Sequence, residues 1–311
     1  MKKLIGLAIA ILVVTLFFTS CEQDNFLEDQ ELTNEEAALE AEADAIEAEL
    51  SKEISLGGFE FMDRVEYEKL PVVAAEELPN LLKDEVSVRS GYRKLPTPPV
   101  VNQGREGSCV SFAVGYVGVS YYLNRLKNMP YTTTGAYRSP EFLYNNTKLS
   151  GSCDAGSNFV PVLNFLRTNG VCSWSQMPYS DVNGCTNRGS SAQRSQALSG
   201  KIRTWTRLYN SSVSNLRSYL DRGYPILTGL QLDASFYQQT TSRNYNYTWR
   251  IKGGSNRGGH AVVITGYDDS RRAFIVQNSW GTSTHDRGFF YISYDLIPYL
   301  MLELYVINPV I

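Results

Sequence analysis

A cysteine, a histidine and an asparagine occur in this chain in a setting that suits nucleophilic catalysis. Cys109 follows a Gly-Ser pair and precedes a long apolar run, and Gln103 lies six residues upstream. A thiol that attacks a carbonyl needs a lowered pKa, a base, and hydrogen-bond donors aimed at the developing oxyanion. At the start of a helix, the thiol would gain from unpaired N–H groups and the positive end of the helix dipole. The candidates for the base and its orienting partner, His260 and Asn278, lie far downstream.

Each of these residues also has an ordinary structural interpretation. A single cysteine in an apolar helix is usually a small buried hydrophobe, and the presence of Gln103 upstream is what favours catalysis for Cys109. The chain holds two histidines. His285 lies in the polar turn formed by residues 282–287, where we expect it to be solvated, so His260 is the candidate base.

The pattern of apolar residues predicts an α+β fold. Residues from Ser108 to Leu126 form one largely buried helix, and shorter helices are expected at about Val160–Asn169 and Val213–Asp221. The later part changes to short apolar runs that predict strands at Ile226–Leu232, Ala261–Tyr267, Phe274–Gln277, Phe289–Ser293 and Leu302–Ile307. Segregation of helices and strands favours two lobes that meet at a cleft, with Cys109 starting a helix and His260 starting a strand.

The first residues predict export. Lys2 and Lys3 precede an apolar segment and then Thr19-Ser20-Cys21, which is typical of a signal peptide over residues 1–20. The apolar run is short for a membrane span. The cysteine resembles the lipidated residue of bacterial lipoproteins, so we expect Cys21 to carry a lipid anchor at the outer membrane or cell surface. An ordinary signal peptide with an incidental cysteine is the alternative.

Residues 21–94 form an acidic tether or a pro-segment. Residues 22–66 hold 16 acidic residues against two basic ones, whereas the whole chain has a net charge of −3, so the remainder is basic. A capping-box pattern at Thr33-Asn34-Glu35-Glu36 predicts a helix as far as about Ile54, with a thin apolar stripe. Either this helix is solvated, or it docks on the basic domain by charge. The positive charge is spread along the chain without a nucleic-acid-binding motif, so no nucleic-acid partner is expected.

Residues 95–311 resemble the papain (C1) family of cysteine peptidases. The resemblance is carried by three segments in a fixed order, which are Gln103 with Gly107-Ser108-Cys109, then Gly259-His260-Ala261-Val262, then Asn278-Ser279-Trp280-Gly281. It implies a papain-like fold with a helical lobe at about 95–205, a lobe with an antiparallel sheet or barrel at about 206–311, and the active site between them. It also implies a monomeric cysteine endopeptidase that acts on proteins or peptides and uses no cofactor or metal.

The resemblance assigns a role to each residue. Cys109 is the nucleophile, His260 the base and later the acid, Asn278 the residue that fixes the imidazole, Gln103 an oxyanion donor, and Trp280 a shield for the Asn–His hydrogen bond. Ala155 and Gly156 would pair with an extended peptide. Gly258 and Gly259 would leave room at the cleft wall. A pocket that lacks a buried carboxylate would then favour an apolar side chain two residues before the cut.

Several positions depart from the family pattern. Glu106 replaces a usual cysteine, and Val110 and Thr284 replace usual tryptophans. No family propeptide signature is recognisable in residues 22–94. These departures fit a divergent bacterial branch, and they keep open the alternative of a catalytically silent surface lipoprotein of the same fold. A transglutaminase-like enzyme is disfavoured because Asn278 stands where that class uses an acid.

The family resemblance also predicts which of the remaining cysteines form a disulfide. The usual partner of Cys153 is missing, and Cys172 and Cys185 flank the segment Met177-Pro178-Tyr179. We therefore predict a disulfide between Cys172 and Cys185, with Cys153 free. No CxxC motif occurs and the histidines are far apart, so no zinc site is expected.

Overall fold

The computed structural model describes residues 33–82, 91–182, 184–300 and 302–310. The predicted signal peptide and Cys21 lie outside these residues. Within the described ranges, no helix combines the length and the apolar character that a membrane span requires.

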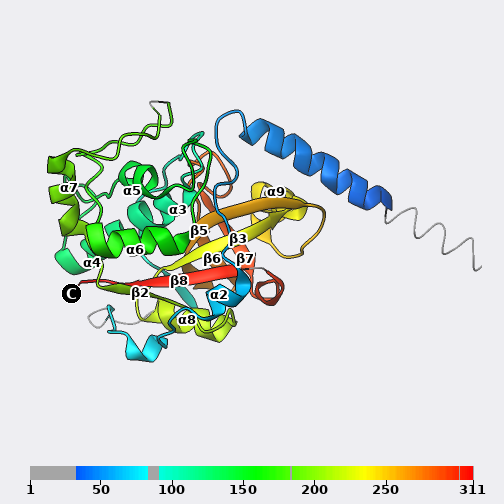
Figure 1. The fold of residues 1–311 in the computed structure, drawn as a ribbon. Coiled ribbons are helices and arrows are strands. Elements are labelled where there is room, and N and C mark those ends of the chain that lie inside the picture. Colours follow the sequence, from blue (N-terminus) through cyan, green and yellow to red (C-terminus); the bar gives the residue numbers. More distant parts are fainter. Residues whose placement is uncertain (1–32, 83–90, 183, 301, 311) are drawn as a thin grey trace, which may run out of the picture.

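A large sheet forms the centre of the molecule (Figure 1). Its strands are β1 Tyr92–Lys94, β2 Thr204–Arg207, β3 Ile226–Asp233, β4 Thr248–Trp249, β5 Asn256–Asp268, β6 Ala273–Gln277, β7 Phe289–Ser293 and β8 Leu302–Asn308. The order is β2-β8-β3-β5-β6-β7-β4, and β1 pairs with β5. Neighbours are antiparallel except β4 and β7, which are parallel. The sheet is therefore mixed and open, which corrects the expectation of an antiparallel sheet or barrel.

The helices lie around this sheet. They are α2 Arg64–Glu68, η1 Ala75–Glu77, α3 Cys109–Ser111, η2 Phe112–Val119, α4 Ser120–Lys127, α5 Pro140–Thr147, α6 Phe159–Asn169, α7 Ser191–Ala197, η3 Leu198–Gly200, α8 Val213–Asp221, α9 Ala234–Thr241 and η4 Ile297–Tyr299, with a further helix over residues 33–50. Helices α3 to α7 gather on one side of the molecule, while α9 lies beside the other end of the sheet (Figure 1). The α+β fold is thus confirmed. His260 lies inside β5 and does not start it.

One continuous helix, formed by α3, η2 and α4, crosses the molecule. Its middle part, η2, is a π-helix in which every side chain is buried. A Cβ at Gly115 would lie 2.6 Å from Cδ1 of Leu143 in α5, so the glycine permits close packing of the two helices. Wider turns of this kind often accompany functional sites, and this one directly follows Cys109.

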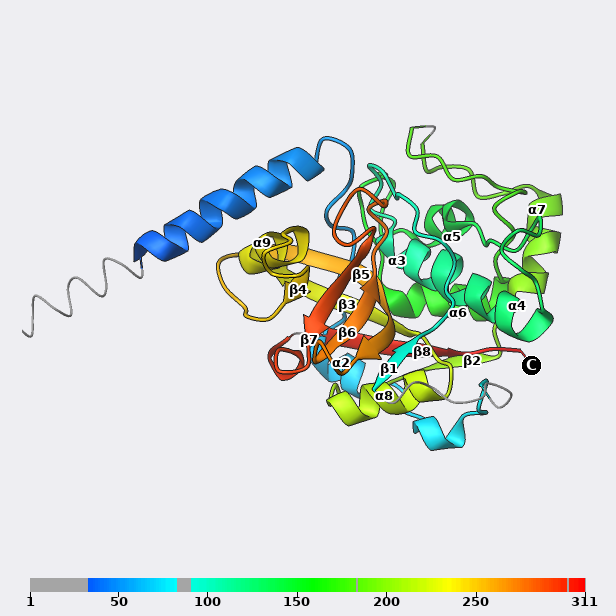
Figure 2. The ribbon, with the colours of Figure 1, turned by 180° about the vertical axis from the view of Figure 1, so that it is seen from behind.

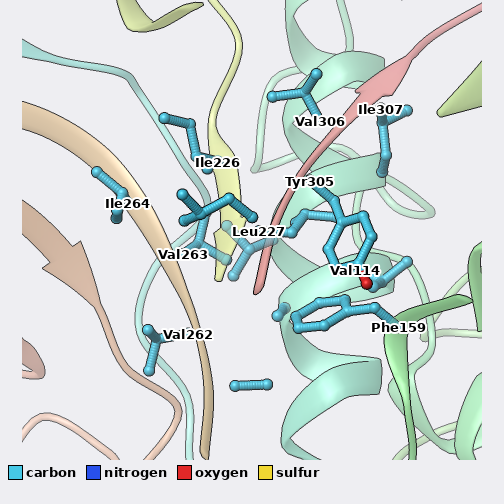
Figure 3. Packing of buried hydrophobic residues seen from close by; sticks show 14 of the residues in the cluster. Val114, Phe159, Ile226, Leu227, Val262, Val263, Ile264, Tyr305, Val306 and Ile307 are labelled. Atoms are coloured by element: carbon cyan, nitrogen blue, oxygen red, sulfur yellow. The ribbon is translucent and has the colours of Figure 1, made fainter. Parts of the chain in front are cut away.

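A single apolar core joins the helices to the sheet. Figure 3 shows Val114 of the central helix and Phe159 of α6 facing Leu227, Val263 and Tyr305 from three adjacent strands. Full burial of each such side chain stabilises the fold by about 1.5–3 kcal/mol. The core presses α3 against β5, so the residues that begin α3 are held next to those of β5.

Residues before 95 are packed on the domain. Strand β1 pairs with β5 through Tyr92 to Lys94, which moves the start of the sheet ahead of the predicted boundary at 95. Tyr67 of α2 bonds with the backbone of Leu304 in β8, and the Tyr219 hydroxyl donates to the Val73 carbonyl at 2.6 Å. Figure 2 shows β1 with α8 next to it, and Arg93 of β1 forms an ion pair with Asp221 of α8 at 2.9 Å.

Candidate active site

Cys109 begins the central helix and is completely buried. Burial raises the pKa of its thiol to about 12, while hydrogen bonds with the backbone of Ala261, Val110 and Cys109 itself oppose this rise. The sulfur therefore lies at the N-terminus of the helix and against the residue that follows His260. This is the juxtaposition that the sequence predicted for a helix tip in one lobe and a strand in the other.

His260 and Asn278 are joined by a hydrogen bond of 2.7 Å between imidazole Nε2 and amide Oδ1. The Ser279 N–H also donates to Asn278 Oδ1 at 2.8 Å. The other imidazole nitrogen, Nδ1, is buried and makes no hydrogen bond. Burial lowers the pKa of His260 to about 4, against the effect of the Asn278 bond. Both shifts favour the neutral thiol and the neutral imidazole in this arrangement.

Trp280 covers this hydrogen bond with its ring. The indole is 1% exposed, and its centroid lies 4.5 Å from that of the His260 imidazole. The His260–Asn278 bond is therefore in an apolar environment, where a hydrogen bond is electrostatically stronger than in water.

His285 is buried, so the expectation of a solvated side chain is wrong. The turn around it is polar in sequence, and the backbone at His285 is left-handed, with φ 54°. The imidazole stacks on Trp280 with centroids 5.6 Å apart and bonds to both Asn278 and the Thr240 carbonyl. The only signal in the sequence was a histidine seven residues after Asn278, which is too general to predict this contact.

Gln103 is completely buried and is held at both ends of its amide. Its Oε1 accepts from the Ser279 hydroxyl at 2.6 Å. Its Nε2 donates to the Glu106 carbonyl at 3.2 Å and to the Ser55 carbonyl at 3.3 Å. A backbone carbonyl from the N-terminal part of the chain thus occupies the donor that was predicted to hold the oxyanion.

Residues 55–60 lie across these groups and are called here the covering segment. The Phe59 N–H donates to the Gly259 carbonyl at 3.3 Å. The Ser157 N–H donates to the Gly58 carbonyl at 2.8 Å, and the Glu60 N–H donates to the Ser157 carbonyl at 3.1 Å. These bonds are made by Ser157, the residue after the predicted peptide-pairing strip at Ala155 and Gly156, whereas the Gly156 carbonyl accepts from the Leu149 N–H at 3.1 Å. Sequence reasoning missed the covering segment.

Glycines make this close approach possible. A Cβ at Gly156 would lie 2.8 Å from the Gly58 carbonyl oxygen, and one at Gly259 would lie 2.3 Å from the Phe59 carbonyl oxygen. A Cβ at Gly258 would meet nothing within 4 Å. The room that was predicted beside Gly259 exists, and the covering segment fills it.

The Phe59 ring occupies a side-chain pocket next to this contact. Its atoms lie 2.2 Å from the position that a Cβ on Gly229 would take, and its centroid is 5.4 Å from that of Phe159. Glu303 is the direct cross-strand partner of Gly229, so its side chain is on the same face of the sheet. The buried carboxylate accepts from the Met62 N–H at 2.5 Å. The expectation of a pocket without a buried carboxylate is therefore wrong.

The helix over residues 33–50 is attached to β5 by charge. Arg257 forms ion pairs with Glu40, with Asp44 at 2.6 Å and with Glu47 at 2.8 Å. Glu40 also accepts from the backbone and hydroxyl of Ser255, and these bonds lower the pKa of its carboxyl. The acidic face of the helix thus contacts the strand that carries His260.

The disulfide joins Cys153 to Cys185, with Cα atoms 5.5 Å apart, and Cys172 is free and buried. The predicted bond between Cys172 and Cys185 is wrong. Glu106 stands where the family has the partner of Cys153, and its carboxylate lies within 4.8 Å of both bonded sulfurs. Cys153 is therefore available to Cys185, whereas the side chain of Cys172 is buried in the apolar core.

Comparisons with known proteins identify the family and the fold. The family model described as "Papain family cysteine protease" matches residues 82–301. Cathepsin B-like CP1 of Giardia intestinalis is 26% identical over 238 residues, which cover 72% of each chain. The structure of xylellain, a cysteine protease from Xylella fastidiosa, is similar with a TM-score of 0.61 and 23% identity over 82% of this chain and 92% of that one. A procathepsin B of Trypanosoma congolense is similar with a TM-score of 0.57 and 15% identity over 82% and 87%.

Proposed function

Because the chain belongs to the papain family of cysteine proteases, we propose that it is an endopeptidase in which Cys109 attacks the peptide carbonyl. The observation that carries this proposal is the pairing of His260 with Asn278 beside the Ala261 backbone that contacts the Cys109 sulfur. Substrates are proteins or peptides, as for papain-like cysteine peptidases in general. The chain is proposed to act as a monomer.

The chemistry follows from the roles of these groups. Once water reaches the site, the Cys109 proton moves to His260 Nδ1, and the thiolate attacks the carbonyl carbon. Gln103 Nε2 and the Cys109 N–H donate to the oxyanion, and removal of one such donor typically costs about 3 kcal/mol of barrier. The imidazolium then protonates the leaving amine as the C–N bond breaks. His260 next takes a proton from a water molecule, whose oxygen attacks the acyl carbon of the thioester. The C–S bond breaks and the acid product leaves, and the imidazolium returns its proton to the Cys109 sulfur, which restores the thiol.

We propose that residues 22–90 act as an inhibitory pro-segment. The support is that the covering segment places the Ser55 carbonyl on Gln103 and bonds to Gly259, directly before His260, and that Cys109 and His260 are both completely buried in this arrangement. Burial keeps the thiol and the imidazole neutral, and a neutral thiol is a poor nucleophile. The ion pairs of Arg257 add a second point of attachment.

The preferred substrate side chain is proposed to be large and apolar at the site that Phe59 occupies. Phe159 and Gly229 give that site an apolar wall. The Glu303 carboxylate at its rear is engaged by the Tyr305 hydroxyl at 2.7 Å, and burial raises the pKa of Glu303. A peptide library that shows a requirement for Arg at this site would contradict the proposed preference.

Residues 1–20 are proposed to direct export, and Cys21 to carry a lipid that anchors the protein at the outer membrane or cell surface. The support is the pattern of Lys2, Lys3, the apolar run and Thr19-Ser20-Cys21. Mass spectrometry of the protein purified from native membranes tests this proposal. A mature N-terminus other than a lipid-modified Cys21 would rule it out.

A catalytically silent binding module is the competing function, because both reactive groups are buried in the closed state. A site for a specific protease, introduced between Leu82 and Gly91, allows the pro-segment to be cut and removed. The enzyme proposal expects peptide hydrolysis after removal, and no hydrolysis in the Cys109→Ala variant treated in the same way. The folded chain from which the pro-segment has been removed is called here the opened chain or opened enzyme. An opened chain that hydrolyses no peptide in a broad library would favour the binding module.

A further inference from the structure

His285 is a buried titratable group for which the proposed chemistry has no use. It stands beside a position where the family usually has a tryptophan, which is Thr284 in this chain. Its ring lies between two protein partners, with Nδ1 3.1 Å from the Thr240 carbonyl oxygen and Nε2 2.9 Å from Asn278 Nδ2. Asn278 is in turn bonded to His260. The second histidine thus stands directly behind the asparagine that orients the first.

The direction of each hydrogen bond follows from the chemistry of the Thr240 carbonyl. A carbonyl oxygen only accepts, so His285 Nδ1 must carry a proton and donate it. In a neutral imidazole the other nitrogen, Nε2, is then an acceptor, and it takes a proton from the Asn278 amide nitrogen. With its amide nitrogen facing His285, Asn278 has its oxygen Oδ1 facing His260. The Ser279 N–H donates to the same oxygen, which independently agrees with this amide orientation.

The same argument about donors and acceptors determines which nitrogen of His260 carries the proton. Since Asn278 Oδ1 only accepts, His260 Nε2 must donate, and the proton of the neutral ring is therefore on Nε2. His260 Nδ1 is left with a free lone pair, in agreement with its lack of a hydrogen-bond partner. This is the tautomer that a base for the Cys109 thiol requires.

We propose that His285 is a positioning residue that fixes the amide orientation of Asn278 and, through it, the Nε2–H tautomer of His260. The inference rests on the proposed peptidase function, since the tautomer matters only if His260 acts as a base. Stacking of His285 on Trp280 and its contacts with Phe236 and Phe290 hold the ring in place. Because both ring nitrogens of His285 are bonded to protein groups, we assign it a positioning and not a catalytic role.

Two substitutions separate positioning from packing. His285→Phe keeps a ring against Trp280 but removes both hydrogen bonds. His285→Gln loses the ring but keeps an acceptor for Asn278 and a donor for the Thr240 carbonyl. Arg287→Gln is the matched control, because its side chain is 89% exposed in the same turn.

The activity readout is kcat and KM of the opened enzyme. We expect His285→Phe to lower kcat about tenfold or more with KM little changed, which is the size of effect seen when the outer hydrogen-bond partner of a metal-bound histidine is lost. His285→Gln should stay within about threefold of the parent, and Arg287→Gln should be unchanged. A packing role would give the opposite order of the two His285 variants, and that order would overturn the proposal.

A spectroscopic readout is independent of turnover. The chain has only two histidines, so an untagged, ¹⁵N-histidine-labelled Cys109→Ala chain gives the signals of just two rings. We expect a neutral His285 protonated on Nδ1 and a neutral His260 protonated on Nε2, with His260 becoming a mixture of tautomers in His285→Phe. A parent His285 protonated on Nε2, or an unchanged His260 tautomer in His285→Phe, would overturn the inference even if the enzyme is active. If the tautomers are as expected but no peptide is cut, the peptidase proposal fails and the positioning geometry stands.

Discussion

The Phe59 backbone N–H donates to the carbonyl of Gly259, the residue directly before His260, across 3.3 Å. A residue of the N-terminal part of the chain thus contacts the strand that carries the base, while Gly58 lies against the loop that leads to Cys109. The covering segment therefore bridges both halves of the proposed catalytic pair, and the reactivity of the cysteine should depend on how well this segment fits.

Gly58→Ala should abolish inhibition by the pro-segment. Gly58 has φ +118°, and a Cβ there would lie 2.6 Å from the Gly107 backbone, so the segment cannot seat. Gly57→Ala is the matched control, because the nearest atom to its Cβ would be 3.8 Å away. The inhibition constant of a separate 22–90 polypeptide, added to opened enzyme, measures the effect. Equal inhibition by the two variants would show that residue 58 does not pack against Gly107 when the pro-segment binds.

Arg257→Gln should weaken binding of the pro-segment by about tenfold, because charge-assisted hydrogen bonds contribute about 1.5–3 kcal/mol and are partly screened at the surface. The Arg257 side chain is 14% exposed and pairs with three carboxylates of the docked helix. The control is Arg272→Gln, which removes an exposed pair with Asp295. Binding should also weaken with added salt in the parent and less so in Arg257→Gln. A salt response that is the same in both would argue that Arg257 does not hold the helix.

Most of the fold, and the candidate site residues that the structure brings together, could be predicted from the sequence because their signals are local. The apolar runs at 213–221 and 274–277 gave the correct helix and strand, and Cys109, His260 and Asn278 each stand within a short motif. The three segments come together because the apolar core fixes the central helix against β5, and apolar periodicity is readable in sequence.

The parts that could not be predicted depend on long-range contacts. The polar turn around His285 indicated solvent, but the ring is buried against α9 through Phe236 and the Thr240 carbonyl, which are far away in the sequence. The pairing of Cys153 with Cys185 depends on which thiols the folded chain brings together, which spacing alone does not determine. Glu303 reaches the Phe59 pocket only because β8 pairs with β3.

Replacement of Cys185 by Ala should lower the free energy of unfolding by about 2–4 kcal/mol, since the disulfide closes a loop with a sequence separation of 32. Cys172→Ala should leave the disulfide intact and remove only a buried thiol. Peptide mapping without reduction identifies the bond, and urea unfolding measures the stability. Recovery of a Cys172–Cys185 peptide from the parent would contradict the assignment.

Glu106→Gln should become more stable than the parent as the pH rises from about 5 to 8. Burial raises the pKa of Glu106 to about 7 from its ordinary 4.5, and the nearby Glu141 carboxylate adds to the rise. The folded state therefore binds the proton more tightly, so the stability linked to Glu106 is present below pH 4.5 and is lost as the pH rises through about 7. The difference between variant and parent should grow by about 2 kcal/mol over this range.

Urea unfolding in a Cys109→Ala background measures this difference without self-cleavage. Glu68→Gln serves as the control, because its carboxylate is exposed in the pair with Arg64. A difference between Glu106→Gln and its parent that does not change with pH would show that Glu106 titrates normally.

The most direct test of the account is labelling of the intact and the opened chain with an epoxide-type cysteine-protease inhibitor, read by mass spectrometry of the labelled peptide. We predict a stoichiometric adduct on Cys109 in the opened chain and no adduct in its His260→Ala variant. The intact chain should be labelled at least about tenfold more slowly than the opened chain. An opened, folded chain that carries no adduct on Cys109, or an intact chain that labels at the same rate, would contradict it.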